Sequence, residues 1–213
     1  MRSFLILAAL LLLAPGAAAQ EMAPFQSVTL ADGGGVTLVQ GPAQRVTVLE
    51  GAGSAEIRVV EGRLLIGHCR TSCPRGERRL RVEVVTPGLA EIAVANGGMI
   101  RAREGFPRQA ELVASVTSGG ILDLRALPAG RVRASVSQGG VILLSAEASL
   151  DASVEQGGRI TYWGRPGVHS RVRGGGVVER GLAAEFTRAP TDLGPGAPPP
   201  VPPLPPLPLA PGL

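Results

Sequence analysis

A nine-residue phrase containing Gly-Gly is repeated five times between residues 90 and 178. The copies are residues 92–100 (IAVANGGMI), 114–122 (ASVTSGGIL), 134–142 (ASVSQGGVI), 152–160 (ASVEQGGRI) and 170–178 (SRVRGGGVV). Their central valines, Val94, Val116, Val136, Val154 and Val172, are 22, 20, 18 and 18 residues apart. Such periods predict a stacked, solenoid-like fold in which each copy buries its apolar face only against its neighbours.

Within each copy, apolar and polar residues alternate before the glycines, and another apolar residue follows them. Alternation is typical of a strand with one buried face. The two glycines permit a sharp turn, because glycine adopts positive φ at little steric cost. Each copy is therefore predicted to form strand, corner, strand, with the apolar side chains of successive copies in continuous inward ladders. The predicted fold class is all-β, a right-handed parallel β-helix-like solenoid.

Polar residues occupy the outward positions beside the corners. The residue just before each glycine pair is a candidate member of a surface ladder that lines a binding groove, and the members are Asn96, Ser118, Gln138 and Gln156. Turns also favour such residues for backbone reasons alone, which is the alternative interpretation. The same stacking predicts that Glu155 and Arg173 lie one rung apart on the outer surface.

Both ends of the chain differ in composition from the repeats. Residues 1–19 are typical of a secretory signal peptide, with Arg2, an apolar stretch over residues 4–13 and small residues before the expected cleavage site. Residues 20–188 are predicted to form one domain, and residues 189–213 a disordered, proline-rich tail. The tail is either a spacer or a ligand for a proline-recognising groove. No segment is long enough to predict a transmembrane span, so we expect a periplasmic or secreted protein.

Between residues 25 and 87 the strand pattern is less regular. It predicts the first coil or coils together with a hairpin that covers the open end of the stack, with a turn at Glu61-Gly62. A second hairpin is predicted between Ile66 and Leu80, with Cys69 and Cys73 at its tip. An even cysteine count in an exported chain favours a Cys69–Cys73 disulfide. A metal site that uses His68 is the alternative, but two thiols and one imidazole are fewer than the usual four ligands.

Charge and aromatic content limit the partners. All 21 basic residues are arginine, against 17 acidic residues, and aromatic residues make up 3% of the chain. Without clustered aromatic side chains for base stacking, we expect no nucleic-acid partner. An envelope glycan, a lipopolysaccharide or another surface protein remains a candidate, and the oligomeric state is left open. No cofactor or metal site is predicted.

The Gly-Gly corners also carry a family resemblance. The SQGG and EQGG copies, followed by Tyr162 and Gly164, the stretch over residues 80–87 and the turn at Gly41 resemble the bacterial GIN domain, also described as the head domain of autotransporter adhesins. The resemblance covers residues 25–178. It implies an exported β-helix-like domain whose biochemical function is unknown and whose adhesin role is inferential. It supplies no catalytic residues.

Three functions are compatible with these features. We expect a non-catalytic envelope or surface module that binds a macromolecule. The first alternative is a polysaccharide-active enzyme, which would need paired carboxylates. The stacking predicts instead that Asp123 lies beside Leu143 and Thr161, and that Asp151 lies beside Arg133 and His169. The second alternative is a structural envelope accessory that acts through the proline-rich tail.

Overall fold

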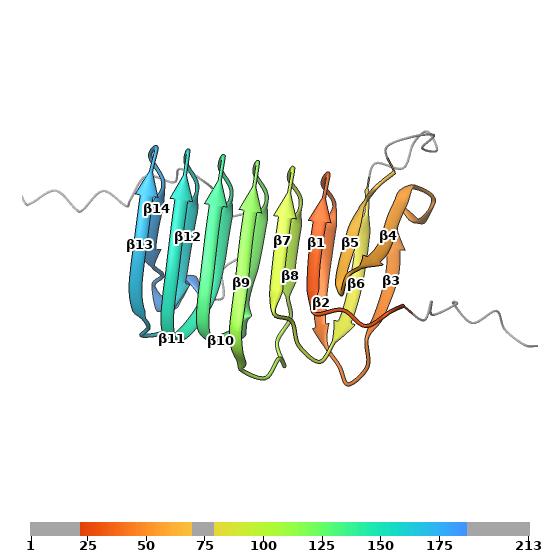
Figure 1. Ribbon diagram of the computed structural model, residues 1–213, viewed down its shortest axis with the longest axis horizontal. Coiled ribbons are helices and arrows are strands. Elements are labelled where there is room, and N and C mark those ends of the chain that lie inside the picture. The colour runs from red at the N-terminus through yellow and green to blue at the C-terminus, as the bar shows by residue number, and fades with distance from the viewer. Residues whose placement is uncertain (1–21, 70–78, 187–213) are drawn as a thin grey trace, which may run out of the picture.

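The computed structural model describes residues 22–69 and 79–186, and these residues form an all-β fold, as predicted. Fourteen strands belong to one hydrogen-bonded sheet. The sheet folds over so that two faces oppose each other, and the strands of successive coils lie side by side along the long axis of the molecule (Figure 1).

Two strands, β10 (Ile121–Ser137) and β11 (Val141–Glu155), run through both faces of the stack. We call the first face the one that also contains β4 (Ala55–Val60), β5 (Arg63–His68), β1 (Ser27–Ala31), β7 (Glu91–Ala95), β9 (Gln109–Thr117) and β13 (Gly167–Arg173). The second face contains β3 (Arg45–Glu50), β6 (Arg81–Thr86), β2 (Gly35–Gln40), β8 (Met99–Ala102), β12 (Arg159–Trp163) and β14 (Val177–Arg180). Short 3₁₀ turns cover Ala52–Ser54 and Ala183–Glu185.

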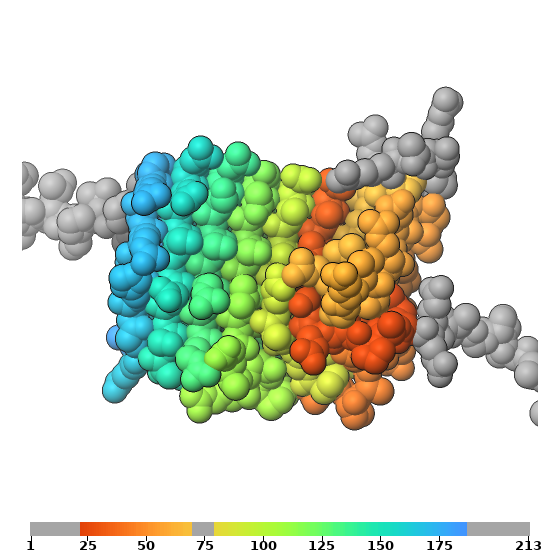
Figure 2. All heavy atoms as spheres, in the orientation of Figure 1, coloured from red at the N-terminus to blue at the C-terminus, as the bar shows by residue number. Residues whose placement is uncertain are grey.

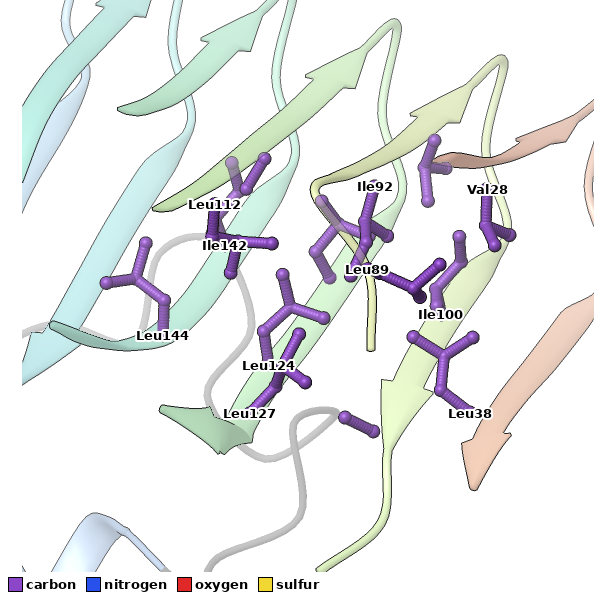
Figure 3. Packing of buried hydrophobic residues seen from close by; sticks show 14 of the residues in the cluster. Val28, Leu38, Leu89, Ile92, Ile100, Leu112, Leu124, Leu127, Ile142 and Leu144 are labelled. Carbon is purple, nitrogen blue, oxygen red and sulfur yellow. The ribbon is translucent and has the colours of Figure 1, made fainter. Parts of the chain in front are cut away.

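The five repeats stack in register through parallel pairing. The central valines are direct neighbours from Val94 to Val116, Val136, Val154 and Val172. Inward side chains from the two faces meet between them, as Leu112, Leu124 and Ile142 do in Figure 3. The predicted inward ladders are therefore present, and the apolar contact between adjacent coils forms the core. The classification of the fold as a right-handed parallel β-helix-like solenoid stays a prediction.

A sixth coil of the same kind, made by β1 and β2, lies inside the stack. Its Asp32-Gly33-Gly34 corner matches Asn96-Gly97-Gly98, and Leu30 pairs with Val94. Residues 41–90 separate the β1–β2 coil from the β7–β8 coil in the sequence. They build the coil of β5 and β6 on its other side, so β1 lies between β5 and β7 (Figure 2). The spatial order of the coils therefore differs from their order in the chain.

The predicted hairpin between Ile66 and Leu80 is wrong. Strand β5 pairs with β1 and β4, whereas β6 pairs with β2 and β3, so the two strands lie on opposite faces. Leu80, just before β6, takes the position that the last corner glycine has in the next coil. Leu80 O accepts the hydrogen bond from Gly35 N at 2.8 Å, as Gly34 O does from Met99 N at 2.9 Å in the next coil. Alternating strands on either side of a loop fit a coil as well as a hairpin.

The hairpin at Glu61-Gly62 is confirmed and lies at one end of the stack. Strands β4 and β5 pair antiparallel, and both turn residues have positive φ, 49° and 72°. Two consecutive positive φ values are typical of a type I′ turn, whose twist suits a two-residue hairpin. On the second face, β3 pairs antiparallel with β6 and completes this end.

Several sequence predictions lie outside the described residues, namely the signal peptide over residues 1–19, the tail over residues 189–213 and Cys73. The Cys69–Cys73 disulfide therefore stays a prediction. In the part of the chain that the structure describes, no helix has the length and apolar character needed to cross a membrane.

Candidate functional site

The four predicted ladder residues lie at equivalent positions on successive corners. Asn96, Ser118, Gln138 and Gln156 are all exposed and all left-handed, with φ between 57° and 59°. Asp32 extends the row at one end with φ 62°. Left-handed backbone is unusual outside glycine, so the corner geometry explains the polar residue types at these positions.

Neighbouring side chains of this row bind one another. Asn96 Nδ2 donates to Asp32 Oδ1 at 3.0 Å, and Ser118 Oγ donates to Gln138 Oε1 at 2.7 Å. The structure therefore brings these residues together as a row along an exposed edge. A role in ligand binding stays a prediction for them.

A larger feature lies on the second face, where no binding site was predicted. An open depression of about 900 Å³ is lined by β2, β6, β8 and β10 and by Phe186. Its charged lining consists of Arg81, Arg101, Arg103, Glu104, Asp123 and Arg125. Four arginines against two acids leave the lining with a formal charge of +2. We refer to it as the arginine depression.

A buried ion pair forms the base of this depression. Arg125 and Asp123 side chains are only 6% and 5% exposed, and Arg125 Nε donates to Asp123 Oδ1 at 2.8 Å while its Nη2 donates to Oδ2 at 2.8 Å. Arg101, which is half-exposed and one rung away, donates from Nε to Asp123 Oδ2 at 3.1 Å. Burial alone would raise the pKa of Asp123, but hydrogen bonds and charge from Arg125 and then Arg101 outweigh it and lower the pKa.

Phe186 lines one side of the depression and belongs to the C-terminal segment, residues 181–186, which follows β14. Arg125 Nη1 donates to the carbonyl oxygens of Glu185 at 2.8 Å and Phe186 at 2.5 Å. Trp163 Nε1 donates to Leu182 O at 3.0 Å, and the Trp163 and Phe186 rings meet edge to face with centroids 5.7 Å apart. Arg125 also lies 5.6 Å from the centre of the Trp163 ring. These contacts fix the position of Phe186, which remains partly exposed.

An apolar cluster on the outer side of the second face explains why residues 181–186 pack there. Val141, Leu143 and Trp163 form a small apolar cluster separate from the core between the faces. The sequence signal is the unbroken apolar run from Val141 to Leu144, which indicates a strand buried on both sides.

The second acid that we considered lies on the first face. Asp151 is flanked by Arg133 and His169, as the stacking predicts, and these residues line a shallow pocket of about 200 Å³. Asp123 likewise pairs in register with Leu143, and Leu143 with Thr161. Arg101, on the other side of Asp123, was not predicted, although the 22-residue step between the first two copies would have placed it there.

The chemistry of these residues suits binding. Asp123 is bound by two guanidinium groups and its pKa is lowered, so it would hold a proton poorly and be a weak general acid. Among the described residues, no group of three or more His, Cys, Asp or Glu side chains could hold a metal ion.

Comparison with known proteins agrees with the repeat pattern. Residues 108–166 match the model of a family described as "Putative auto-transporter adhesin, head GIN domain". No curated protein matches the chain. Among solved structures, it is similar to a putative adhesin of Bacteroides fragilis NCTC 9343, with 18% identity and a TM-score of 0.41, over 76% of this chain and 94% of that one.

Two further solved structures are similar over comparable lengths. A putative adhesin of Parabacteroides merdae ATCC 43184 has 15% identity and a TM-score of 0.32, over 76% of this chain and 93% of that one. A protein of Parabacteroides distasonis ATCC 8503, described as a putative lipid binding protein, has 13% identity and a TM-score of 0.35, over 78% and 96%. The expected resemblance to the GIN domain family is confirmed, and residues 108–166 are the part of the chain that carries it.

Proposed function

We propose that this chain is a non-catalytic envelope or surface module that binds a glycan in the arginine depression. The right-handed β-helix-like solenoid would serve as a rigid scaffold for that site. The adhesin description of the matching family supports a role in recognition outside the cell or at its envelope.

The observation that carries the proposal is the pairing of planar charged groups with an exposed aromatic ring on a rigid sheet. Arg101 is held in place by the buried carboxylate of Asp123, and Phe186 is held by Arg125 and Trp163. Guanidinium groups bind carboxylate and phosphate groups in a fixed fork geometry. A ring beside them offers a flat apolar surface to a sugar. The formal charge of +2 favours a glycan that carries acidic groups.

The alternative of a polysaccharide-active enzyme has less support. Cleavage of a glycosidic bond requires one carboxyl group that can donate a proton and a second close by. Asp123 is locked between two arginines. The other alternative, an accessory that acts through the proline-rich tail, concerns residues outside those described.

Calorimetric titration of the purified protein with acidic and neutral envelope polysaccharides tests the proposal. We expect saturable binding of an acidic polysaccharide that weakens about tenfold, ~1.4 kcal/mol, in Arg101→Ala and in Phe186→Ala. Arg133→Ala is the matched control, because Arg133 is an exposed arginine on the first face, and it should leave affinity unchanged. Equal losses in all three variants, or none in the first two, would contradict the proposed site.

A further inference from the structure

The stack ends in open strand edges. Within residues 22–69 and 79–186, β13 pairs only with β11 and β14 only with β12, so one end presents two edges. In the same part of the chain, β4 pairs only with β5 and β3 only with β6, so the opposite end presents two edges as well. An exposed edge offers unpaired backbone groups to another strand.

Apolar exposure is concentrated at these ends. Among the described residues, the exposed large apolar side chains are Leu49 and Val60 at one end, Val168, Val172 and Val177 at the other, and Leu182 and Phe186 in the C-terminal segment. Val172 is 45% exposed, although its neighbour Val154 in the same inward ladder is fully buried. The difference arises because Val172 belongs to the last coil and has no coil beyond it.

A second copy of this chain fits both edges at once. The edges of β13 and β14 are separated by the cross-section of a coil, and so are those of β4 and β3. A single added strand would cover one edge only. The opposite end of another copy also presents one edge strand on each face.

The inward ladders would continue across such a junction. Following the register from strand to strand, the row that ends at Val172 begins at Ile57, and the row that ends at Val178 begins at Val48. Head-to-tail contact would therefore place valine and isoleucine side chains against each other and remove them from water.

The charges on the edge strands distinguish head-to-tail contact from contact between two identical ends. The outward residues of β13 are His169, Arg171 and Arg173, so pairing of two β13 edges would bring basic side chains together. On β4 the outward residues are Glu56, Arg58 and Val60, of which Glu56 lies in the row of Arg173 and Val60 in the row of His169. Arg58 lies in the row of Arg171, so the head-to-tail contact combines one favourable pair with one unfavourable pair.

We propose that copies of this chain assemble head to tail, with β13 and β14 of one copy paired to β4 and β3 of the next. The strands at the junction would be antiparallel, because β3 and β4 run opposite to the other strands of the stack. A head-to-tail contact does not close on itself unless the copies form a ring, so the product is a linear filament. This assembly is independent of the arginine depression.

Light scattering coupled to size exclusion, with the purified full chain over a range of concentrations, tests the proposal. The mass should rise with concentration for the unmodified chain. Val172→Lys and Ile57→Lys each place a charge at one end of the same inward ladder, so each blocks one end of the stack and each variant alone should have the mass of a monomer. An equimolar mixture of the two should form a dimer of twice that mass, because each retains one native end.

The control Thr117→Lys places the same charge on an exposed position in the middle of the stack and should leave self-association intact. Circular dichroism and the melting temperature would show that each variant is folded. Val172→Thr and Ile57→Thr keep the β-branched shape and should weaken association less than lysine. A monomer at every concentration, self-association of either lysine variant alone, or no dimer in the mixture would overturn the proposal.

Discussion

At the scale of single residues, the two glycines of each corner have different reasons to be glycine. Both have positive φ, 83° at Gly139 and 112° at Gly140. A Cβ on Gly139 would meet no atom within 4 Å, whereas a Cβ on Gly140 would lie 2.5 Å from Val116 Cγ1 and 3.1 Å from Gly120 O. The first glycine is therefore required by its backbone conformation, and the second also by the close approach of the neighbouring coil.

This difference predicts unequal effects of alanine. Gly139→Ala should lower the free energy of unfolding by about 1 to 2 kcal/mol, the usual cost of left-handed backbone. Gly140→Ala should lower it by roughly a further 1 to 3 kcal/mol, because the corner would be overpacked. Urea unfolding followed by circular dichroism measures both values. Equal losses would show that the coils can move apart at little cost.

The buried carboxylate of Asp123 predicts a pH effect. Asp123→Asn should destabilise the protein at pH 7 by about 3 to 5 kcal/mol, because Arg125 would remain buried without its ionic partner. The folded-state pKa of Asp123 is lowered, so its contribution is fully present above the unfolded pKa of about 3.9 and is lost as pH falls through the folded value.

Unfolding of the parent and the Asn variant should therefore be compared at pH 7 and at successively lower pH. The difference between them should narrow below about pH 4. Glu111→Gln, which breaks the exposed pair with Arg131, is the control and should cost at most about 1 kcal/mol. A gap that stays constant in acid would mean that folding does not lower the pKa of Asp123.

At the scale of strands and segments, the C-terminal segment should shield the single tryptophan of the chain. Trp163 is 8% exposed, and its indole binds Leu182 and contacts Phe186. A chain that ends at Arg180 should have red-shifted fluorescence and faster quenching by iodide. A chain that ends at Phe186 is the matched control and should keep the parent emission. Identical spectra for the two truncations would show that residues 181–186 do not cover the ring.

Some of the strand pairing could be predicted from the sequence. Val94, Val116, Val136 and Val154 were predicted as inward neighbours because strict alternation and a near-constant period leave one register. The pair Asp32 and Asn96 was missed because residues 41–90 intervene, so the β1–β2 coil has no neighbour at the repeat distance in sequence. Strand alternation at Ile66 and Leu80 could not decide between a hairpin and a corner, since both place the same side chains inward.

The candidate site was less predictable than the fold. Arg101, Asp123 and Arg125 come from two neighbouring coils, and Phe186 comes from a segment beyond the repeats. Alignment of the repeats can predict that Arg101 lies beside Asp123. It carries no information about the docking of residues 181–186, which depends on the outer apolar cluster of Val141, Leu143 and Trp163.

At the scale of the whole molecule, a stack of coils should be most stable in its middle. Val136 has a coil on each side, whereas Val172 has one on a single side only. Contact energy in repeat folds comes largely from nearest neighbours, so terminal coils should open more readily. Native-state hydrogen exchange should find slower exchange at amides of β10 and β11 than at those of β13 and β14. Uniform protection along the stack would instead indicate a single cooperative unit.

The position of the β1–β2 coil between those of β5–β6 and β7–β8 has a consequence for synthesis. A nascent chain leaves the ribosome from its N-terminus, so residues 27–40 emerge before either of their neighbours exists. One neighbour is complete only after Thr86 and the other after Ala102. The β1–β2 coil therefore gains its neighbours on both sides only after it has been synthesised, whereas every later coil pairs with a coil that already exists when it emerges.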